Sequence, residues 1–264
     1  MEKSRRVAIL VDGGFYLKRL PKLVSAEDCS DPGRVVEHLQ QACKNHVENL
    51  YRRNNREWIG HVYRIFFYDA EPYSGRGHHP LENIQIDFSS SPLAEFRRAL
   101  FDKLRRQRKV ALRLGKVTRE GDWSPPTDKV RKILKTRDLL ENIDLDNAND
   151  QGDIVIPANQ VEEAKRLKAR WLGIQNHEVR LGFRQKGVDM RIGLDIASIT
   201  LKKQADAIIL ISGDSDFVPA AKLARREGIE FILDPMWQNV NEDLYEHIDG
   251  LHSGFQRPSR NPSQ

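Results

Sequence analysis

Short apolar runs recur along this chain, and longer amphipathic stretches separate them. The runs occupy residues 7–11, 62–68, 110–115, 207–212 and 229–233. A short, continuous apolar run is typical of a strand that is buried on both faces of a parallel sheet. Helical periodicity predicts helices over residues 32–51, 93–109, 188–203 and 217–227. Strands that alternate with helices in this way predict an α/β fold whose sheet is covered on both faces.

The regular pattern weakens between residues 116 and 177. Residues 138–153 contain six acids and no Lys or Arg, and a mixed-charge helix is predicted at 161–172. We therefore predict a single domain over residues 1–255 that carries a polar, partly helical insertion at about 116–177. Residues 256–264 contain no apolar residue other than proline, which predicts a disordered tail.

Composition narrows the class of protein. Hydrophobic residues make up 39% of the 264 residues, which is enough for a core. The 43 basic and 38 acidic residues give a net charge of +5, which permits an anionic partner such as nucleic acid. The two cysteines and the absence of an apolar leader or a membrane-length apolar run predict a cytoplasmic protein without a membrane partner. A homo-oligomer or a protein partner stays open.

Carboxylates follow two of the predicted strands. Asp12 comes directly after the first apolar run, and Gly213-Asp214-Ser215-Asp216 follows the fourth. Ligands bind at the carboxyl ends of parallel strands, so acids placed there converge even when they are far apart in sequence. A turn role for Asp12 and a helix-capping role for Asp214 or Asp216 remain the simpler alternatives.

Two further acids lie on the predicted helix 188–203. Asp189 is in its first turn, on a strip without basic residues. Asp195 falls on a different, polar strip with Arg191 and Lys202, where ordinary ion pairs within the helix are the alternative to a role in a site.

Several carboxylates in one crevice repel one another unless a cation lies among them. Carboxylate and water ligands suit Mg²⁺ or Mn²⁺, and such an ion activates water and binds a phosphate oxygen. Zinc fits less well, because the two cysteines are 14 residues apart and no HExxH occurs. We interpret the pair His78-His79 as part of a solvated loop.

Three segments of the chain resemble the NYN domain family, the PIN-like metal-dependent ribonucleases. They are Leu10-Val11-Asp12-Gly13-Gly14-Phe15, the stretch from Lys186-Gly187-Val188-Asp189 to Asp195-Ile196-Ala197, and Ile211-Ser212-Gly213-Asp214-Ser215-Asp216-Phe217-Val218-Pro219. The resemblance implies a Rossmann-like three-layer α/β/α fold and a divalent-metal site that cuts RNA. It places Asp12, Asp189, Asp214 and Asp216 at the metal as catalytic residues, with Asp195 as a further candidate ligand. Many members carry Asn three residues after the first Asp, where this chain has Phe15.

Basic and aromatic residues are candidates for contact with the substrate. Residues 97–113 contain eight basic positions and one acid, so their side chains either bind RNA phosphates or form a solvated helix face. The named candidates are Arg97, Arg98, Arg105, Arg106 and Lys186. Tyr16, Tyr68 and Tyr73 either stack on bases or pack in the core. Asp69, after the second strand, is a candidate to support the metal ligands.

The predicted function is a metal-dependent endoribonuclease that hydrolyses single-stranded or structured RNA with Mg²⁺ or Mn²⁺. The main alternative is a weakly active or inactive module that binds RNA or a protein partner on the same fold. A phosphatase of the haloacid dehalogenase type fits less well, because Gly14 stands where its general acid would be. A dinucleotide site is disfavoured, since no GxGxxG follows the first strand.

Overall fold

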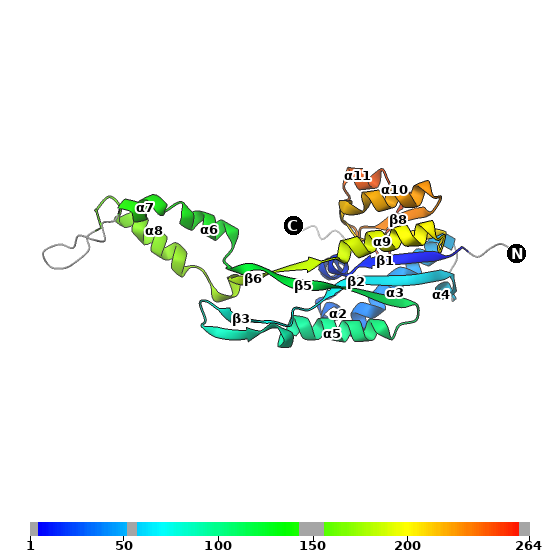
Figure 1. Cartoon of the computed structure of the whole chain (residues 1–264), viewed down its shortest axis with the longest axis horizontal. Helices are drawn as coiled ribbons and strands as arrows, with labels where there is room; N and C mark the ends of the chain where they lie inside the picture. The colour runs from blue at the N-terminus through cyan, green and yellow to red at the C-terminus, as the bar shows by residue number, and fades with distance from the viewer. Residues whose placement is uncertain (1–4, 52–56, 143–155, 259–264) are drawn as a thin grey trace. The chain divides into compact units, whose positions relative to one another are not determined.

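The computed structural model describes residues 5–51, 57–142 and 156–258, and these divide into two compact units (Figure 1). The first unit comprises residues 1–75, 88–118 and 185–264, and the second comprises residues 76–87 and 119–184. The second unit overlaps the predicted insertion at 116–177 but also includes a segment that precedes it. Most of the predicted acidic loop, and residues 259–264 of the predicted tail, lie outside the described residues.

A seven-stranded sheet has the order β6-β5-β2-β1-β7-β8-β9. Its strands are β1 (Val7–Asp12), β2 (Val62–Glu71), β5 (Val110–Ser124), β6 (Arg180–Lys186), β7 (Ala207–Ile211), β8 (Glu230–Asp234) and β9 (Gly250–Leu251). The pairings from β5 through β2, β1, β7 and β8 to β9 are all parallel. The prediction of a mainly parallel α/β sheet is therefore confirmed.

Helices cover both faces of this sheet (Figure 1). In β1, Val7, Ile9 and Val11 pack on the face covered by α3 (Pro32–Tyr51) and α5 (Pro92–Arg105). Ala8 and Leu10 point to the opposite face, under α9 (Val188–Leu201) and α10 (Val218–Arg226). Successive strand residues point to opposite faces, so the continuous apolar run is explained by burial on both sides. The result is the three-layer α/β/α arrangement that the sequence predicts.

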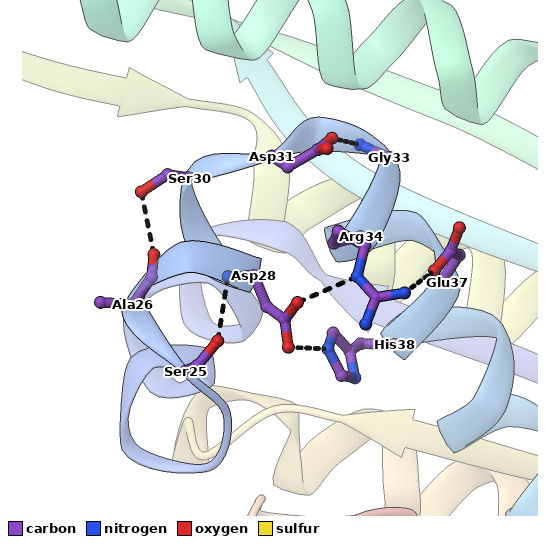
Figure 2. A network of polar contacts seen from close by, with 9 residues as sticks. All are labelled: Ser25, Ala26, Asp28, Ser30, Asp31, Gly33, Arg34, Glu37 and His38. Atoms are coloured by element: carbon purple, nitrogen blue, oxygen red, sulfur yellow. Dashed lines mark hydrogen bonds and ion pairs between the residues drawn. The ribbon is translucent and has the colours of Figure 1, made fainter.

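Shorter helices complete the first unit. They are α1 (Gly13–Arg19), η1 (Leu20–Lys22), α2 (Ala26–Ser30), α4 (Trp58–His61), η2 (Phe88–Ser90), η4 (Ser215–Phe217) and α11 (Glu242–Tyr245). Figure 2 shows how polar contacts tie α2 to the start of α3. The carboxylate of Asp28 accepts hydrogen bonds from Arg34 Nε at 2.9 Å and lies 3.0 Å from His38 Nε2, and Arg34 also pairs with Glu37. The hydrogen bond from Arg34, followed by that of His38, lowers the pKa of Asp28.

A buried hydrogen-bonded pair, His46 and Asp234, joins α3 to the end of β8. His46 Nε2 lies 2.7 Å from Asp234 Oδ2, and both side chains are almost completely buried. Asp234 also accepts the backbone N–H groups of Met236 at 2.7 Å and Gly254 at 2.9 Å. Burial alone would raise the pKa of Asp234, but the hydrogen bond and charge of His46 and these backbone donors lower it. One carboxylate thus connects a helix, a strand end and a segment near residue 254.

Replacement of Asp234 by Asn is expected to lower the free energy of unfolding by about 3 kcal/mol at pH 7, because it breaks this buried pair. A carboxylate with a lowered pKa stabilises the fold above its unfolded-state pKa of about 4, and this contribution is lost as the pH falls through the folded-state pKa. The difference between wild type and Asp234→Asn should therefore shrink below about pH 4. Urea unfolding between pH 7 and pH 3 measures this difference in the free energy of unfolding, and the variant Asp128→Asn, at an exposed position, is the control. A difference that is constant over this range would contradict the assignment.

The second unit contains the antiparallel pair β3 (Arg76–His79) and β4 (Ile84–Asp87) with four helical segments. These are α6 (Thr127–Leu134), α7 (Arg137–Asn142), α8 (Val161–Leu172) and η3 (Asn176–Glu178). The interpretation of His78-His79 as a solvated loop is wrong, because both residues belong to β3 and His79 is buried. Its Nε2 lies 3.1 Å from the carbonyl oxygen of Asn176, and its ring packs edge-on against Trp123.

Two negative findings concern the described parts of the chain. None of the helices in those ranges combines the length and apolar character that crossing a membrane requires. Cys29 and Cys43 are both free thiols, the second of them buried.

Candidate functional site

The acids predicted from the sequence gather where β1 and β7 end. Val11 of β1 lies opposite Ile211 of β7 in the parallel pairing, so Asp12 and the segment after Ile211 leave the sheet at the same edge. Asp12 caps α1 and accepts the N–H of Phe15 at 3.0 Å. Asp214 caps η4 and accepts the N–H of Asp216 at 3.0 Å. The capping alternative is therefore correct for Asp214, and Asp12, for which a turn role was the alternative, caps a helix as well. Each still presents its carboxylate at this edge.

Ser212 connects the two strand ends, and the sequence reasoning did not single it out. Its buried hydroxyl group donates to Asp12 Oδ2 at 3.4 Å and accepts the N–H of Asp214 at 3.3 Å. The Ser-Gly-Asp order of the segment was the available signal, because a hydroxyl two residues before the acid is within reach of its backbone N–H.

Electrostatics place Asp189 beside the other acids. It lies in the first turn of α9, after Gly187, whose φ of 78° is in the left-handed region that glycine readily adopts. Burial and then the charges of Asp214 and Asp216 raise the pKa of Asp189. Burial is also the main cause of the raised pKa of Asp12, to which the charge of Asp189 adds. The four carboxylates are thus near enough to repel one another, and we call them the carboxylate cluster.

The carboxylate cluster fits a divalent ion in its chemistry, but its side chains are not arranged as ligands in advance. Over the ranges that the structure describes, no group of three or more Asp, Glu, His or Cys side chains is positioned to hold a metal ion. The donors are all carboxylate oxygens, the set that Mg²⁺ and Mn²⁺ prefer, and their repulsion is what a cation would relieve. Binding would therefore require the carboxylates to approach one another more closely.

Asp195, the additional candidate, is engaged in a different network. Its Oδ2 accepts the hydroxyl of the buried Tyr68 at 2.8 Å and pairs with Arg113 Nε at 3.2 Å. The alternative of ion pairs with Arg191 and Lys202 within the helix is wrong in its partners, because strand β5 brings Arg113 to Asp195 instead. Burial and then the charge of Asp195 raise the pKa of Tyr68, which keeps its hydroxyl protonated as the donor.

Asp69, at the end of β2, is completely buried and forms an ion pair with Arg97. Its Oδ1 also accepts the N–H of Ala70 at 2.8 Å and lies 3.4 Å from Gln185 Nε2. The Oε1 atom of Gln185 is 3.7 Å from the position of a Cβ on Gly14, so this amide lies between Asp69 and the start of α1. Burial lowers the pKa of Arg97, whose guanidinium is held by Asp69. The sequence offered no signal for Gln185, which comes from a polar strand.

The remaining basic candidates are dispersed. Arg98 is exposed in the second turn of α5 and donates to the carbonyl oxygen of Ser89 at 2.7 Å. Arg105, which pairs with Asp102, and Arg106 lie at the other end of α5, just before β5 begins. That end of the helix faces the amino ends of the strands, away from the carboxylate cluster. Lys186 is exposed at the end of β6, three residues before Asp189.

Two of the three tyrosines are core residues. Tyr16 is buried and donates its hydroxyl hydrogen to the carbonyl oxygen of Val35 at 2.9 Å, and Tyr68 is buried against Asp195. Tyr73 is partly buried and packs edge-on against Phe88. Neither Tyr16 nor Tyr68 presents a ring face on which a base could stack.

A shallow groove of about 440 Å³ opens beside the carboxylate cluster, between α9 and α10. Asp189 and Asp216 lie at its wall. Its other residues are mainly apolar and include Met190, Ala197 and Leu223. The carboxylates therefore lie at an accessible surface.

Phe15, which departs from the family pattern, packs against Gly213. A Cβ on Gly213 would lie 2.7 Å from the Phe15 ring and 3.1 Å from Gln238 Nε2. With the Phe15 ring in this position, there is therefore no room for a side chain at position 213.

Gly213→Ala is therefore expected to destabilise the fold by about 1–3 kcal/mol and to displace Asp214, because the added methyl group overlaps the Phe15 ring. Thermal unfolding followed by circular dichroism measures the loss, and the matched control is Gly60→Ala, where no atom lies within 4 Å of the added Cβ. The double variant Phe15→Ala, Gly213→Ala should recover part of the loss. A single variant as stable as Gly60→Ala would show that the ring moves aside without cost.

The three-layer α/β/α fold and its carboxylate-rich edge agree with what the sequence resemblance implies. The family model of the NYN domain matches residues 125–249 and confirms the resemblance seen in the sequence. The matched range includes Asp189, Asp214 and Asp216 and excludes Asp12.

Other comparisons add little to this match. No curated protein matched the chain. Among solved structures, the chain is similar to a protein of unknown function, VPA0982, from Vibrio parahaemolyticus RIMD 2210633. The identity is 13%, the alignment covers 97% of this chain and 98% of the other, and the TM-score is 0.40.

Proposed function

We propose that this protein is a metal-dependent endoribonuclease that hydrolyses RNA phosphodiesters. The observation that carries the proposal is the carboxylate cluster, in which acids from β1, α9 and the segment after β7 repel one another at an exposed edge. Structural ion-pair networks also shift pKa values, but the charged neighbours that add to the effect of burial on the pKa of Asp12 and of Asp189 are other carboxylates. Nuclease activity is the general property of NYN domains, and the family match supports it.

In this proposal Asp12, Asp189, Asp214 and Asp216 hold Mg²⁺ or Mn²⁺. The ion, when bound, supplies an activated water and a positive charge for the phosphate oxygens. The protein supplies the carboxylates and holds them in position. Ser212 fixes the orientation of Asp12 by its hydrogen bond and holds the backbone of Asp214 in place.

Basic residues near the same edge are proposed to bind the RNA backbone. Lys186 is exposed three residues before Asp189, and Arg98 is exposed near the start of α5. Phosphate contacts of this kind are independent of sequence and weaken with salt. The free thiols of Cys29 and Cys43 are compatible with the reducing cytoplasm, which we propose as the location.

The test is a cleavage assay with the purified full chain. Unstructured RNA, incubated with Mn²⁺ or Mg²⁺, should be cut, and chelation by EDTA should stop the reaction. Release of phosphate from a small phosphomonoester, with the RNA left intact, would instead indicate the phosphatase alternative.

An inactive binding module is the second candidate. It is favoured by the lack of a ready metal-ligand group within the described ranges and by Phe15 at the position where many family members have Asn. RNA that is bound but left intact at every Mn²⁺ and Mg²⁺ concentration would support this module and overturn the nuclease proposal.

A further inference from the structure

A second pocket opens at the carboxyl end of β8, on the side of the sheet edge next to the carboxylate cluster. We propose that it binds one nucleobase of a single-stranded RNA, stacked on the indole ring of Trp237. The pocket has a volume of about 480 Å³, and its polar lining residues include Gln238, Asn239, His252 and Arg257. This inference rests on the proposed function, because it assigns the pocket to the RNA whose phosphodiester the carboxylate cluster would cut.

The first argument is the position of the pocket. Strands β7 and β8 are parallel neighbours with Ile211 opposite Asp234, so the segments that follow them leave the sheet side by side. Gln238, which lines the pocket, has its Nε2 atom 3.1 Å from the position of a Cβ on Gly213. Gly213 precedes Asp214 directly. A residue that lines the pocket therefore lies beside the segment that carries Asp214 of the carboxylate cluster.

The second argument is the rigid presentation of the Trp237 ring. Met236 and Trp237 both adopt left-handed backbone conformations, with φ values of 47° and 61°, which are unfavourable for large side chains. Three contacts hold this turn, because Asp234 accepts the N–H of Met236, Arg19 donates to the Met236 carbonyl oxygen at 2.8 Å, and Trp237 Nε1 donates to the carbonyl oxygen of Phe255 at 2.9 Å. Such strain persists where surrounding contacts enforce it and is concentrated at ligand sites.

This turn leaves the indole partly in solvent. Trp237 remains 43% exposed although its ring nitrogen is bonded and its backbone is fixed. An aromatic face that is fixed in position and open to water is the element on which unpaired bases stack.

The third argument is the chemistry around the ring. The guanidinium carbon of Arg257 lies over one face of the Trp237 ring, 5.6 Å from its centroid, and brings a positive charge to the pocket. A base that stacks on this indole therefore uses the other ring face or displaces the guanidinium. None of the residues that the structure shows lining this pocket is an acid. The amides of Gln238 and Asn239 supply the donors and acceptors that base edges require. The groove between α9 and α10 has the opposite character, because Asp189 and Asp216 lie in its wall.

Binding of fluorescein-labelled hexauridine, followed by anisotropy, tests the inference on the full chain. Trp237→Ala is expected to weaken binding by about 10-fold, in the range that the loss of one base–aromatic stack produces, and Trp237→Phe should retain most of the affinity. The matched control is Trp171→Ala, which removes an exposed indole, 56% accessible, from α8. Thermal melting of each variant checks that the fold is retained.

If Trp237→Ala fails to fold, photocrosslinking of the wild-type protein tests the pocket instead. Wild-type protein is irradiated with an RNA hexamer that contains 5-iodouridine, and the crosslinked peptide is identified by mass spectrometry. A crosslink at Trp237 supports the pocket, whereas crosslinks confined to other segments overturn it.

The failure of this inference differs from the failure of the proposed function. If wild type cuts RNA while Trp237→Ala and Trp171→Ala bind hexauridine with equal affinity, the base pocket is wrong and the nuclease stands. If wild type neither binds nor cuts RNA, both the base pocket and the proposed nuclease function are wrong. Protection of Trp237 by a protein partner, with no effect of RNA, would also overturn the inference.

Discussion

Asp214→Asn is expected to reduce RNA hydrolysis by about 1,000-fold or more while RNA binding is retained. The amide keeps the size and the capping acceptor of the carboxylate, so the N–H of Asp216 in η4 should still donate its hydrogen bond to the side-chain oxygen of residue 214. What disappears is one negative charge from the carboxylate cluster, and with it most of the affinity for the ion. Loss of several kcal/mol of transition-state stabilisation corresponds to a rate decrease of this size.

The measurement is single-turnover cleavage of a labelled RNA, with binding followed separately by anisotropy. Asp243→Asn, an exposed acid on α11, is the matched control and should cut RNA at the wild-type rate. If Asp214→Asn and wild type cleave at equal rates, the activity has come from a contaminant or from another site. Partial recovery of the variant at high Mn²⁺ concentration would agree with a weakened metal site.

Arg97→Met is expected to lower the free energy of unfolding by about 3–5 kcal/mol, because it leaves the buried carboxylate of Asp69 without its cation. The loss of stability would identify Arg97 as a structural residue, whereas the sequence analysis names it as a candidate phosphate contact, with a solvated helix face as the alternative. Arg106→Met, which removes an exposed arginine at the far end of the same helix, should change stability by less than about 0.5 kcal/mol.

Chemical denaturation measures both variants. The double variant Asp69→Asn, Arg97→Met removes the charge together with its partner and should be more stable than Arg97→Met alone. If Arg97→Met unfolds at the wild-type denaturant concentration but binds RNA weakly, the ion pair does not stabilise the fold, and phosphate contact is the correct role for Arg97.

The sequence predicts the buried part of the fold and fails where strands are polar. The helix over residues 32–51 and the strands around Val7, Ala207 and Glu230 are found within about one residue, because burial on both faces produces continuous apolar runs. Strand β6 has the sequence Arg-Leu-Gly-Phe-Arg-Gln-Lys and is mostly exposed, so no apolar run marks it. The second half of β5 and the β3–β4 pair are missed for the same reason, since backbone hydrogen bonds rather than side chains define them.

The residues of the candidate site also differ in whether the sequence could predict them. Asp12 and Asp214 were predictable, because the end of a buried strand fixes where the next residue lies. Gln185 and the contact of Ser212 with Asp12 were not, since they depend on which strands are neighbours, and only the contact of Ser212 with the N–H of Asp214 had a local signal. The partner of Asp195 was not among the alternatives for the same reason, because helix periodicity reveals contacts within a helix but not the arginine that β5 contributes.

The pairing of β1 with β7 has a consequence for synthesis of the chain. Asp12 is among the first residues made, yet Ser212, the hydroxyl that orients it, follows 200 residues later. At about 5–20 residues per second, translation leaves the first strand waiting roughly 10–40 seconds for its neighbour in the sheet. A growing chain therefore carries no assembled acidic edge until β7 has been made, and a fragment that stops before β7 should lack this edge.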